Sequence, residues 1–310
     1  MSKIIVITGP TATGKSALGI RLAREIDGEI ISADSMQVYK YMDIGTAKPT
    51  QEEMFGITHH MIDIIPPWED YSVARYTEDA SKCINDVLSR GKQPILLGGT
   101  GLYIDSLLKG RSFLARADIS LRRKLEEEYN KSGGEAMMSK LREVDAKSAA
   151  KLHINDKKRI IRALETYMTT GVSISKHDEE SKNLPPRYDP VKIALMLSDR
   201  NALYFRIDNR VGEMLTRGLE NEVRSLLDMG VSRSNTAMQA IGYKEISDAI
   251  INGSDIDTAA EKIKMESRRY AKRQLTWLRR DSEINWLFPE HAQDSDEFLK
   301  KLMELINETK

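Results

Sequence analysis

The segment GPTATGKS, residues 9–16, constrains the fold of this chain more than any other part of the sequence. It matches the pattern G-x-x-x-x-G-K-[ST], follows the apolar run KIIVIT and precedes a helical pattern that begins at Lys15. In this setting the two glycines let successive backbone N–H groups point into one concavity beside a helix N-terminus. The sequence therefore predicts a phosphate-binding loop between a buried strand and a helix.

Further apolar runs predict a sheet around this first strand. Helical patterns separate most of the runs, notably over Lys15–Ile26 and Ser72–Arg90, so we expect an α/β fold with a P-loop-containing core and a mostly parallel sheet flanked by helices. We expect the second strand to pack beside the first, which brings the residues after both strands to one edge of the sheet. The predicted strands are Lys3–Thr8, Glu29–Ala33, His60–Ile64, Pro94–Gly98, Val191–Leu197 and Ile284–Phe288.

The region 112–186 interrupts this alternation. Its patterns are helical only, over Ser120–Lys131, Gly134–Leu152 and Asp156–Thr170, and a strand-like run resumes at Val191. The sequence therefore predicts a helical insertion domain, residues 112–186, within a core domain made of residues 1–111 and 187–310.

Composition narrows the class of protein. Basic and acidic residues balance at 47 each, so affinity for a polyanion must come from local patches. The single cysteine, Cys83, excludes an internal disulfide framework. No apolar run approaches the ~20 residues of a membrane span, and the N-terminus carries no signal-peptide pattern. We therefore expect a cytoplasmic protein with no membrane partner.

The phosphate loop by itself leaves the reaction open. Lys15 supplies a cation and the Ser16 hydroxyl can ligate Mg²⁺, as in kinases, NTPases and enzymes that hold pyrophosphate as a leaving group. A GTPase is disfavoured because no NKxD motif occurs, and the carboxylates that could end a Walker-B-like strand, Asp63 and Asp199, are weak signals. The predicted phosphate contacts are Gly9, Pro10, Thr11, Ala12, Thr13, Gly14, Lys15 and Ser16.

Asp34 is a candidate catalytic carboxylate because it follows the second predicted strand. It fits a general base near the reacting group, and it also fits a structural N-cap or a residue near a magnesium ion. Ser35 and Gln37 add neutral groups suited to the edge of a nucleobase.

Six motifs together resemble the tRNA dimethylallyltransferase family, also called tRNA isopentenyltransferase, in its bacterial form. They are GPTATGKS, DSMQVYKYMDIGTAKP (34–49), GGTGLY (98–103), HINDKKRIIRALE (153–165), AIGYKE (240–245) and KRQLTWLR (272–279). The resemblance implies transfer of a dimethylallyl group from its pyrophosphate to the exocyclic amine of the adenosine just 3′ of the anticodon. Eukaryotic members carry a C-terminal zinc finger, and this sequence contains none.

The resemblance gives roles to particular residues. Lys15, the loop N–H groups and Mg²⁺ near Ser16 would neutralise the departing pyrophosphate, and Asp34 would take a proton from the adenine amine. Thr100 would hold the base or the pyrophosphate, or cap the helix that follows. Arg206 and Arg210, one helical turn apart, could aim guanidinium groups at pyrophosphate, although a solvated helix face explains them equally well.

Basic clusters predict surfaces for RNA. Between Lys262 and Arg280 the residues Arg268, Arg269, Lys272, Arg273, Arg279 and Arg280 fall on one arc of a helix, diluted only by Glu266. A second cluster lies in the inserted helices. With the family as a guide, the predicted tRNA contacts are Asp34, Ser35, Met36, Gln37, Thr100, Arg122, Lys158, Arg159, Ile160, Ile161, Arg162, Gln239, Ala240, Ile241, Gly242, Tyr243, Lys244, Lys272, Arg273, Gln274, Leu275, Thr276, Trp277, Leu278 and Arg279.

Three other functions compete with this interpretation. A small-molecule kinase, which would be an ATP-binding enzyme, gives the basic helix no task. An adenylate isopentenyltransferase needs no surface for an anticodon arm, and a non-enzymatic tRNA-binding module leaves GPTATGKS and Asp34 without a use. We expect a monomer that uses Mg²⁺ and dimethylallyl pyrophosphate and holds no redox cofactor.

Overall fold

A computed structural model describes residues 3–110, 119–182 and 185–308. The chain divides into two compact units: Met1–Leu108 together with Tyr188–Lys310, and Lys109–Arg187. We call these the core unit and the helical unit. No helix in the described ranges is long and apolar enough to cross a membrane.

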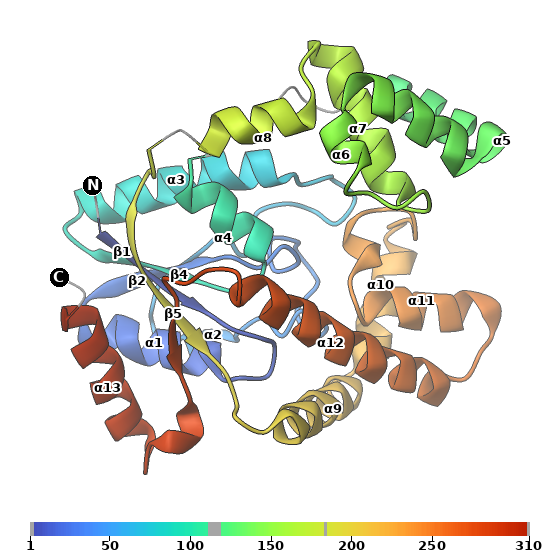
Figure 1. Ribbon diagram of the computed structural model, residues 1–310. Helices are drawn as coiled ribbons and strands as arrows, with labels where there is room; N and C mark the ends of the chain where they lie inside the picture. The colour runs from blue at the N-terminus through green and yellow to red at the C-terminus, as the bar shows by residue number, and fades with distance from the viewer. Residues whose placement is uncertain (1–2, 111–118, 183–184, 309–310) are drawn as a thin grey trace. The chain divides into compact units, whose positions relative to one another are not determined.

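The core unit is built on one six-stranded sheet in the order β3-β2-β4-β1-β5-β6, and every pair is parallel (Figure 1). This confirms the predicted α/β fold. The expected pairing of the second strand with the first is wrong, because Ile95 of β4 pairs with both Ile5 and Ile30. The strands are β1 (Lys3–Thr8), β2 (Gly28–Ser32), β3 (His59–His60), β4 (Gln93–Leu97), β5 (Asp189–Leu195) and β6 (Asn285–Leu287).

Helices cover both faces of this sheet. Successive side chains of β1 face opposite sides, so Ile4 and Val6 enter one buried cluster with α3 and α4, while Ile5 and Ile7 enter another with α1 and α13. Burying each such side chain contributes about 1.5–3 kcal/mol. The helices of the core unit are α1 (Lys15–Glu25), α2 (Gln51–Met54), α3 (Val73–Ser89), α4 (Gly101–Leu108), α9 (Arg200–Thr216), α10 (Leu219–Asp228), α11 (Tyr243–Asn252), α12 (Ile256–Leu278) and α13 (Ser295–Glu308), with 3₁₀ turns at Ala237–Gln239 and Pro289–His291.

The third strand is much shorter than the predicted His60–Ile64. The chain leaves the sheet after His60, because Met61 and Asp63 adopt left-handed backbone angles, with φ of 65° and 55°. Lys48 supports this turn from a buried position, where its ammonium group donates to the Tyr39 carbonyl oxygen at 3.0 Å and to the Asp63 carboxylate at 2.5 Å. Tertiary contacts therefore override the local apolar pattern.

The helical unit contains α5 (Ile119–Val144), α6 (Ala146–Ala149), α7 (Lys157–Thr170) and α8 (Ile174–Lys182). Its own buried cluster includes Met137 and Leu141 of α5 and Ile160 of α7. Gly133 breaks α5 with φ 81° and ψ 168°, between two helices that the sequence predicts separately. The predicted helix Gly134–Leu152 is too long, because Asp145 leaves helical geometry and caps α6 through the Ser148 N–H.

The two ends of the helical unit lie next to each other. Gly110 adopts φ 58°, and a Cβ atom built on it would stand 3.6 Å from the Cβ of Arg187. The chain therefore enters and leaves this unit at neighbouring points.

Candidate active site

The phosphate loop lies between β1 and α1, as predicted. Gly9 has φ 140°, and a Cβ atom there would stand 2.4 Å from the carbonyl oxygen of Leu195 in β5, so only glycine fits. Gly14, with φ 90°, is the N-cap of α1. The Thr13 hydroxyl donates to the Pro10 carbonyl oxygen at 2.9 Å and fastens the turn from within.

Two cations stand over this loop. Lys15 donates to the Pro10 carbonyl oxygen at 2.6 Å, and Arg210 of α9 donates to the Thr11 hydroxyl at 3.3 Å. Burial and, to a smaller extent, the charge of Arg210 lower the pKa of Lys15 to about 7, while the charge of Asp34 opposes both effects. Burial also lowers the pKa of Arg210. Two poorly hydrated positive groups side by side form a site that an anion would stabilise.

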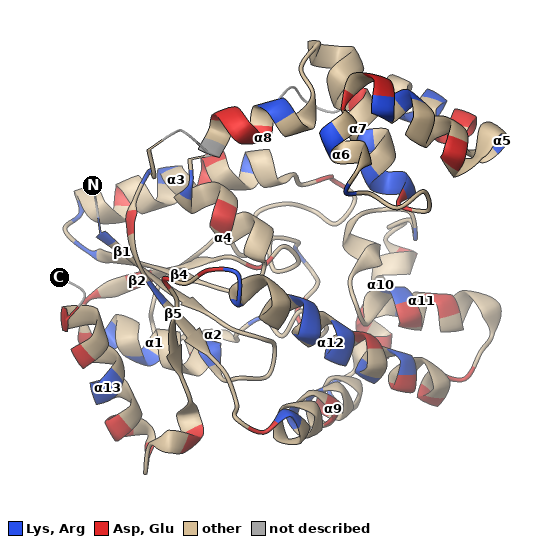
Figure 2. Cartoon of the chain, in the orientation of Figure 1, with Lys and Arg blue, Asp and Glu red and all other residues tan. Residues whose placement is uncertain are grey.

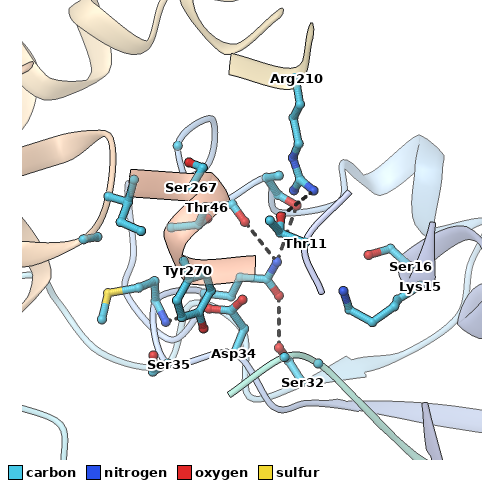
Figure 3. A pocket seen from close by; sticks show the side chains of 18 of the residues that line it. Thr11, Lys15, Ser16, Ser32, Asp34, Ser35, Thr46, Arg210, Ser267 and Tyr270 are labelled. Carbon is cyan, nitrogen blue, oxygen red and sulfur yellow. Dashed lines mark hydrogen bonds between the residues drawn. The ribbon is translucent and has the colours of Figure 1, made fainter. Parts of the chain in front are cut away.

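Asp34 lies in the same pocket as these cations. It follows β2, and its Oδ1 accepts the Met36 N–H at 2.8 Å, which leaves Oδ2 without a partner in the described parts of the chain. Figure 3 shows Asp34 and Ser35 facing the pocket that Lys15 and Ser16 also line. The structure therefore brings together a carboxylate and the phosphate loop, although β4 separates the strands that carry them.

Thr100 links the loops after β2 and β4. Its hydroxyl oxygen accepts the Ser35 N–H at 3.1 Å, and it precedes α4 in the chain. Tyr270 of α12 lines the same pocket as Asp34 (Figure 3). Burial and the charge of Asp34 raise the pKa of Tyr270 to about 12, while hydrogen bonds with the side chains of Thr100 and Gln274 oppose this shift. Sequence analysis missed Tyr270 as a pocket residue, because an aromatic residue on the side of a helix opposite its basic residues indicates packing in the core.

Two cavities meet at the phosphate loop. One has a volume of about 370 Å³ and is lined by Asp34, Gln37, Tyr270 and Gln239–Ile241. The other, of about 720 Å³, is lined by Gly14 and by the cations Arg24, Arg206 and Arg217. Lys15, Ser16 and Arg210 line both. The predicted arginines thus have different places: Arg210 stands at the junction and Arg206 only in the larger cavity.

The loop after Asp34 forms another wall of the smaller cavity. Gln37 accepts from the Ser32 hydroxyl at 3.0 Å and donates to the carbonyl oxygen of Thr46 at 3.3 Å, so its amide is used within the protein. Met36 also lines the cavity. The hydrogen bonds of Gln37 hold the segment that contains Gly45, Thr46 and Ala47 against β2.

Glu222 of α10 holds the same segment from outside, a role that sequence analysis missed. Its carboxylate accepts the N–H groups of Asp43, Ile44 and Gly45 at 2.9, 2.8 and 3.2 Å, and also accepts the Tyr243 hydroxyl. No local pattern signals this contact, because 177 to 179 residues separate the partners.

Several predicted tRNA contacts line the smaller cavity, and others lie on α11 and α12. Gln239, Ala240 and Ile241 line it, Gly242 opens α11, and Lys244 is exposed on the first turn of that helix. On α12, Leu275 packs against the same buried cluster as Ala12 of the phosphate loop, and Thr276 is exposed.

Seven residues of the predicted tRNA-contact ranges are buried. Ile160, Ile161, Ala240, Tyr243, Gln274 and Leu278 are each at most 7% exposed, and Gly242 is also buried. Packing within the protein accounts for most of the surface of these residues.

The predicted arc of basic residues on and just after α12, which we call the basic stripe, is partly neutralised by acidic side chains. Figure 2 shows several blue segments along this helix. Arg268 donates to both carboxylate oxygens of Asp208 on α9 at 2.6 Å, and Arg269 pairs with Glu266. Asp208 lies sixty residues away in the chain, so the arc predicted from the sequence overstated the available charge.

The remaining basic residues of the stripe are exposed. Lys272, Arg273, Arg279 and Arg280 have no acidic partner among the described residues, and Arg273 stands over the Tyr270 ring at 5.6 Å while lining the smaller cavity. Lys272 and Arg273 lie in the last two turns of α12, and Arg279 and Arg280 directly follow the helix.

The helical unit carries its own cationic cluster. Arg122 and Arg162 both donate to one carboxylate oxygen of Glu165, at 2.9 and 3.2 Å, and each guanidinium side chain remains 41% exposed. Lys158 is exposed nearby on the same helix as Arg162, and Arg159 pairs with Asp156 at 3.2 Å. Two arginines share one acid, so the cluster keeps a net positive charge.

Family models match nearly the whole chain. Residues 37–281 match IPP transferase, and residues 2–66 match isopentenyl transferase. Among curated relatives, a tRNA dimethylallyltransferase of Acetivibrio thermocellus is 48% identical over 303 residues, which cover 97% of this chain and 96% of the relative. One from Oceanobacillus iheyensis is 49% identical over 284 residues and covers 91% and 90%.

Solved structures give the same similarity. The tRNA isopentenylpyrophosphate transferase of Bacillus halodurans superposes with a TM-score of 0.74 at 40% identity, over 100% of this chain and 97% of that chain. A eukaryotic dimethylallyltransferase acting on tRNA gives a TM-score of 0.79 at 32% identity, over 93% and 74%.

Proposed function

The chain belongs to the IPP transferase family, and from this premise we propose that it transfers a dimethylallyl group from dimethylallyl pyrophosphate to the N6 amine of the adenosine 3′-adjacent to the anticodon. That it is a prenyltransferase acting on tRNA follows from the family and from relatives of nearly full length. One observation supports the finer assignment: Lys15, Arg210 and Asp34 line the same cavity.

The phosphate loop is suited to a leaving group. When the allylic C–O bond breaks, the prenyl carbon gains carbocation character and the departing pyrophosphate gains negative charge. Lys15, Arg210 and the N–H groups of the loop stand where that charge grows, and they are held before the reaction begins. Interactions that strengthen in the transition state accelerate the step, whereas equal binding of both states does not.

Asp34 is the proposed general base. The N6 amine is a poor nucleophile because its lone pair is delocalised into the adenine ring, so a base must take its proton as the new C–N bond forms. The fixed Oδ1 of Asp34 holds the carboxylate in place through Met36, and Oδ2 is available to the proton. Ser35, whose N–H is fixed by Thr100, and Gln239 supply polar groups around the same space.

Mg²⁺ fits the donor groups of this site. The Ser16 hydroxyl lines the pocket beside the phosphate loop and would hold such an ion together with oxygens of the substrate. The ion would add positive charge beside the departing diphosphate.

The tRNA would contact both units. Lys272, Arg279 and Arg280 of the core unit, and Arg122, Lys158 and Arg162 of the helical unit, provide cations for the phosphate backbone. An adenine stacked in an anticodon arm must leave the stack before its amine can be alkylated. We place that adenine in the smaller cavity, beside Asp34.

The test is direct. The protein is incubated with dimethylallyl pyrophosphate, Mg²⁺ and unmodified tRNA, and the tRNA is digested and analysed by mass spectrometry. We expect one adenosine, beside the anticodon, to gain a dimethylallyl group in place of a hydrogen atom, with one pyrophosphate released per transfer. Modification of free AMP in place of tRNA, or consumption of ATP, would refute the proposal.

A further inference from the structure

Gln274 joins the two loops that surround the reacting groups. Its Oε1 accepts the backbone N–H of Thr11, in the phosphate loop, at 3.0 Å, and its Nε2 donates to the carbonyl oxygen of Gly99, directly before Thr100, at 3.0 Å. The side chain is 7% exposed. One amide group thus uses its acceptor on one loop and a donor on the other.

The space around Gly99 is shaped for this amide. A Cβ atom on Gly99 would stand 2.2 Å from the Nε2 of Gln274, closer than any side chain permits. Two residues along, a Cβ on Gly101 would stand 2.3 Å from the Trp277 ring, whose Nε1 donates to Asp105 of α4 at 3.0 Å. The buried side of α12 therefore reaches the backbone on both sides of Thr100.

We propose that Gln274 is a positioning residue that sets the spacing between the phosphate loop and the Thr100 loop. This inference rests on the proposed function. The phosphate loop holds the diphosphate, and Thr100 holds the loop of Asp34 through the Ser35 N–H. Gln274 thereby keeps the leaving group and the base at the correct spacing for one substrate pair.

The same geometry links the exposed side of α12 to the site. Lys272 and Arg273 directly precede Gln274 in the chain and are exposed, while Gln274 points inward. One turn of helix therefore exposes Lys272 and Arg273 to solvent and directs the amide of Gln274 toward the phosphate loop and the Thr100 loop.

The first experiment separates positioning from RNA contact. Gln274→Met keeps the length of the side chain but removes both hydrogen bonds. We expect kcat/KM for dimethylallyl pyrophosphate to fall about 10- to 100-fold, as for other small misplacements of reacting groups, while the Kd for tRNA changes less than about twofold. Gln293→Leu, at an exposed glutamine near α13, is the matched control and should leave both constants unchanged.

A double-mutant cycle tests whether Gln274 acts through its contact with Gly99. Gly99→Ala alone should lower kcat/KM because the new methyl group displaces the Gln274 amide. In a Gln274→Ala background the amide is gone, so Gly99→Ala should add less than about a twofold loss. Additive losses would overturn the inference even if Gln274→Met folds poorly.

The remaining outcomes are also decisive. A Gln274→Met enzyme with normal kinetics, or one that loses tRNA affinity while kcat and the KM for dimethylallyl pyrophosphate stay normal, would refute the positioning role. If the wild-type protein prenylates no tRNA, the proposed function fails instead, and binding of inorganic pyrophosphate by calorimetry still reports whether Gln274→Met and the cycle alter the phosphate loop.

Discussion

Lys15 and Arg210 share the wall between the two cavities, and the charge of Arg210 adds to burial in lowering the pKa of Lys15 to about 7. A lysine with an ordinary pKa would stay charged throughout the neutral range. With a pKa of about 7, Lys15 changes its charge within this range, so we expect the affinity of the phosphate loop for a diphosphate to depend on pH.

Binding of dimethylallyl pyrophosphate should weaken as pH rises above 7. Below pH 7 Lys15 is already protonated in the free protein, and above it the protein must take up a proton to bind the diphosphate, which raises the lysine pKa. We expect Kd to rise by up to about tenfold per pH unit over this range, with proton uptake visible by calorimetry in two buffers.

Lys15→Arg serves as the control for this titration, because a guanidinium keeps its charge at every pH used. Its Kd should lack the rise above pH 7, whatever its absolute value. A wild-type Kd that is flat between pH 6.5 and about pH 9 would contradict the lowered pKa.

Asp34→Asn should abolish proton transfer while preserving the loop. The amide oxygen of asparagine can still accept the Met36 N–H, so the backbone after β2 keeps its hydrogen bond. We expect kcat to fall about 10²- to 10⁴-fold, with tRNA affinity within about twofold of wild type. Single-turnover kinetics and filter binding measure the two quantities, and near-normal turnover would exclude Asp34 as the base.

Neutralising Lys272 and Arg279 together should weaken tRNA binding and flatten its dependence on salt. Both side chains are exposed without an acidic partner in the described residues, so the Lys272→Gln/Arg279→Gln protein loses up to two phosphate contacts. The slope of log K against log [salt] should become shallower by about 1–2. Lys300→Gln on α13, which packs on the opposite face of the sheet, should leave the slope unchanged; equal effects of the two changes would argue against the stripe.

Glu165→Gln should loosen the helical unit. Glu165 is 1% exposed, and its charge holds both Arg122 and Arg162. Since the arginines are partly exposed, we expect the free energy of unfolding to fall by about 1–3 kcal/mol, which is less than for a fully buried pair. Urea unfolding measures it, with Arg159→Gln, which removes an exposed pair with Asp156, expected to cost less than about 0.5 kcal/mol.

Glu222→Gln should destabilise the segment Asp43–Gly45 and reduce activity. The carboxylate accepts three backbone N–H groups and the Tyr243 hydroxyl, and an amide cannot accept them all. We expect the free energy of unfolding to fall by about 1–3 kcal/mol. For Tyr243→Phe, which removes one donor, we expect a fall of about 1 kcal/mol. Hydrogen exchange at Asp43–Gly45 would locate the change, and unaltered exchange there would contradict the role of Glu222.

Local patterns predicted the elements that depend on neighbours in the chain. β1 spans the predicted Lys3–Thr8, and α1 begins at the predicted Lys15, because a strand, a glycine-framed loop and a helix specify one another within a few residues. The proximity of Asp34 to the phosphate loop was also predicted, although the reason given for it, direct pairing of the first two strands, is wrong.

Contacts between distant residues escaped prediction. The predicted strand His60–Ile64 is longer than β3, because no residue near Met61 signals the left-handed turn, which Lys48 supports from within the fold. No local pattern signals the hydrogen bond between Gln274 and Thr11, because 263 residues separate them. The charge of Arg268 was counted as available for the same reason, because Asp208 comes from another helix.

The adjacency of Gly110 and Arg187 has an evolutionary consequence. A module whose two connections meet at one point can grow, shrink or be exchanged without shifting the register of the strands on either side. Changes in the length of this unit can therefore leave β4 and β5 in place in the sheet.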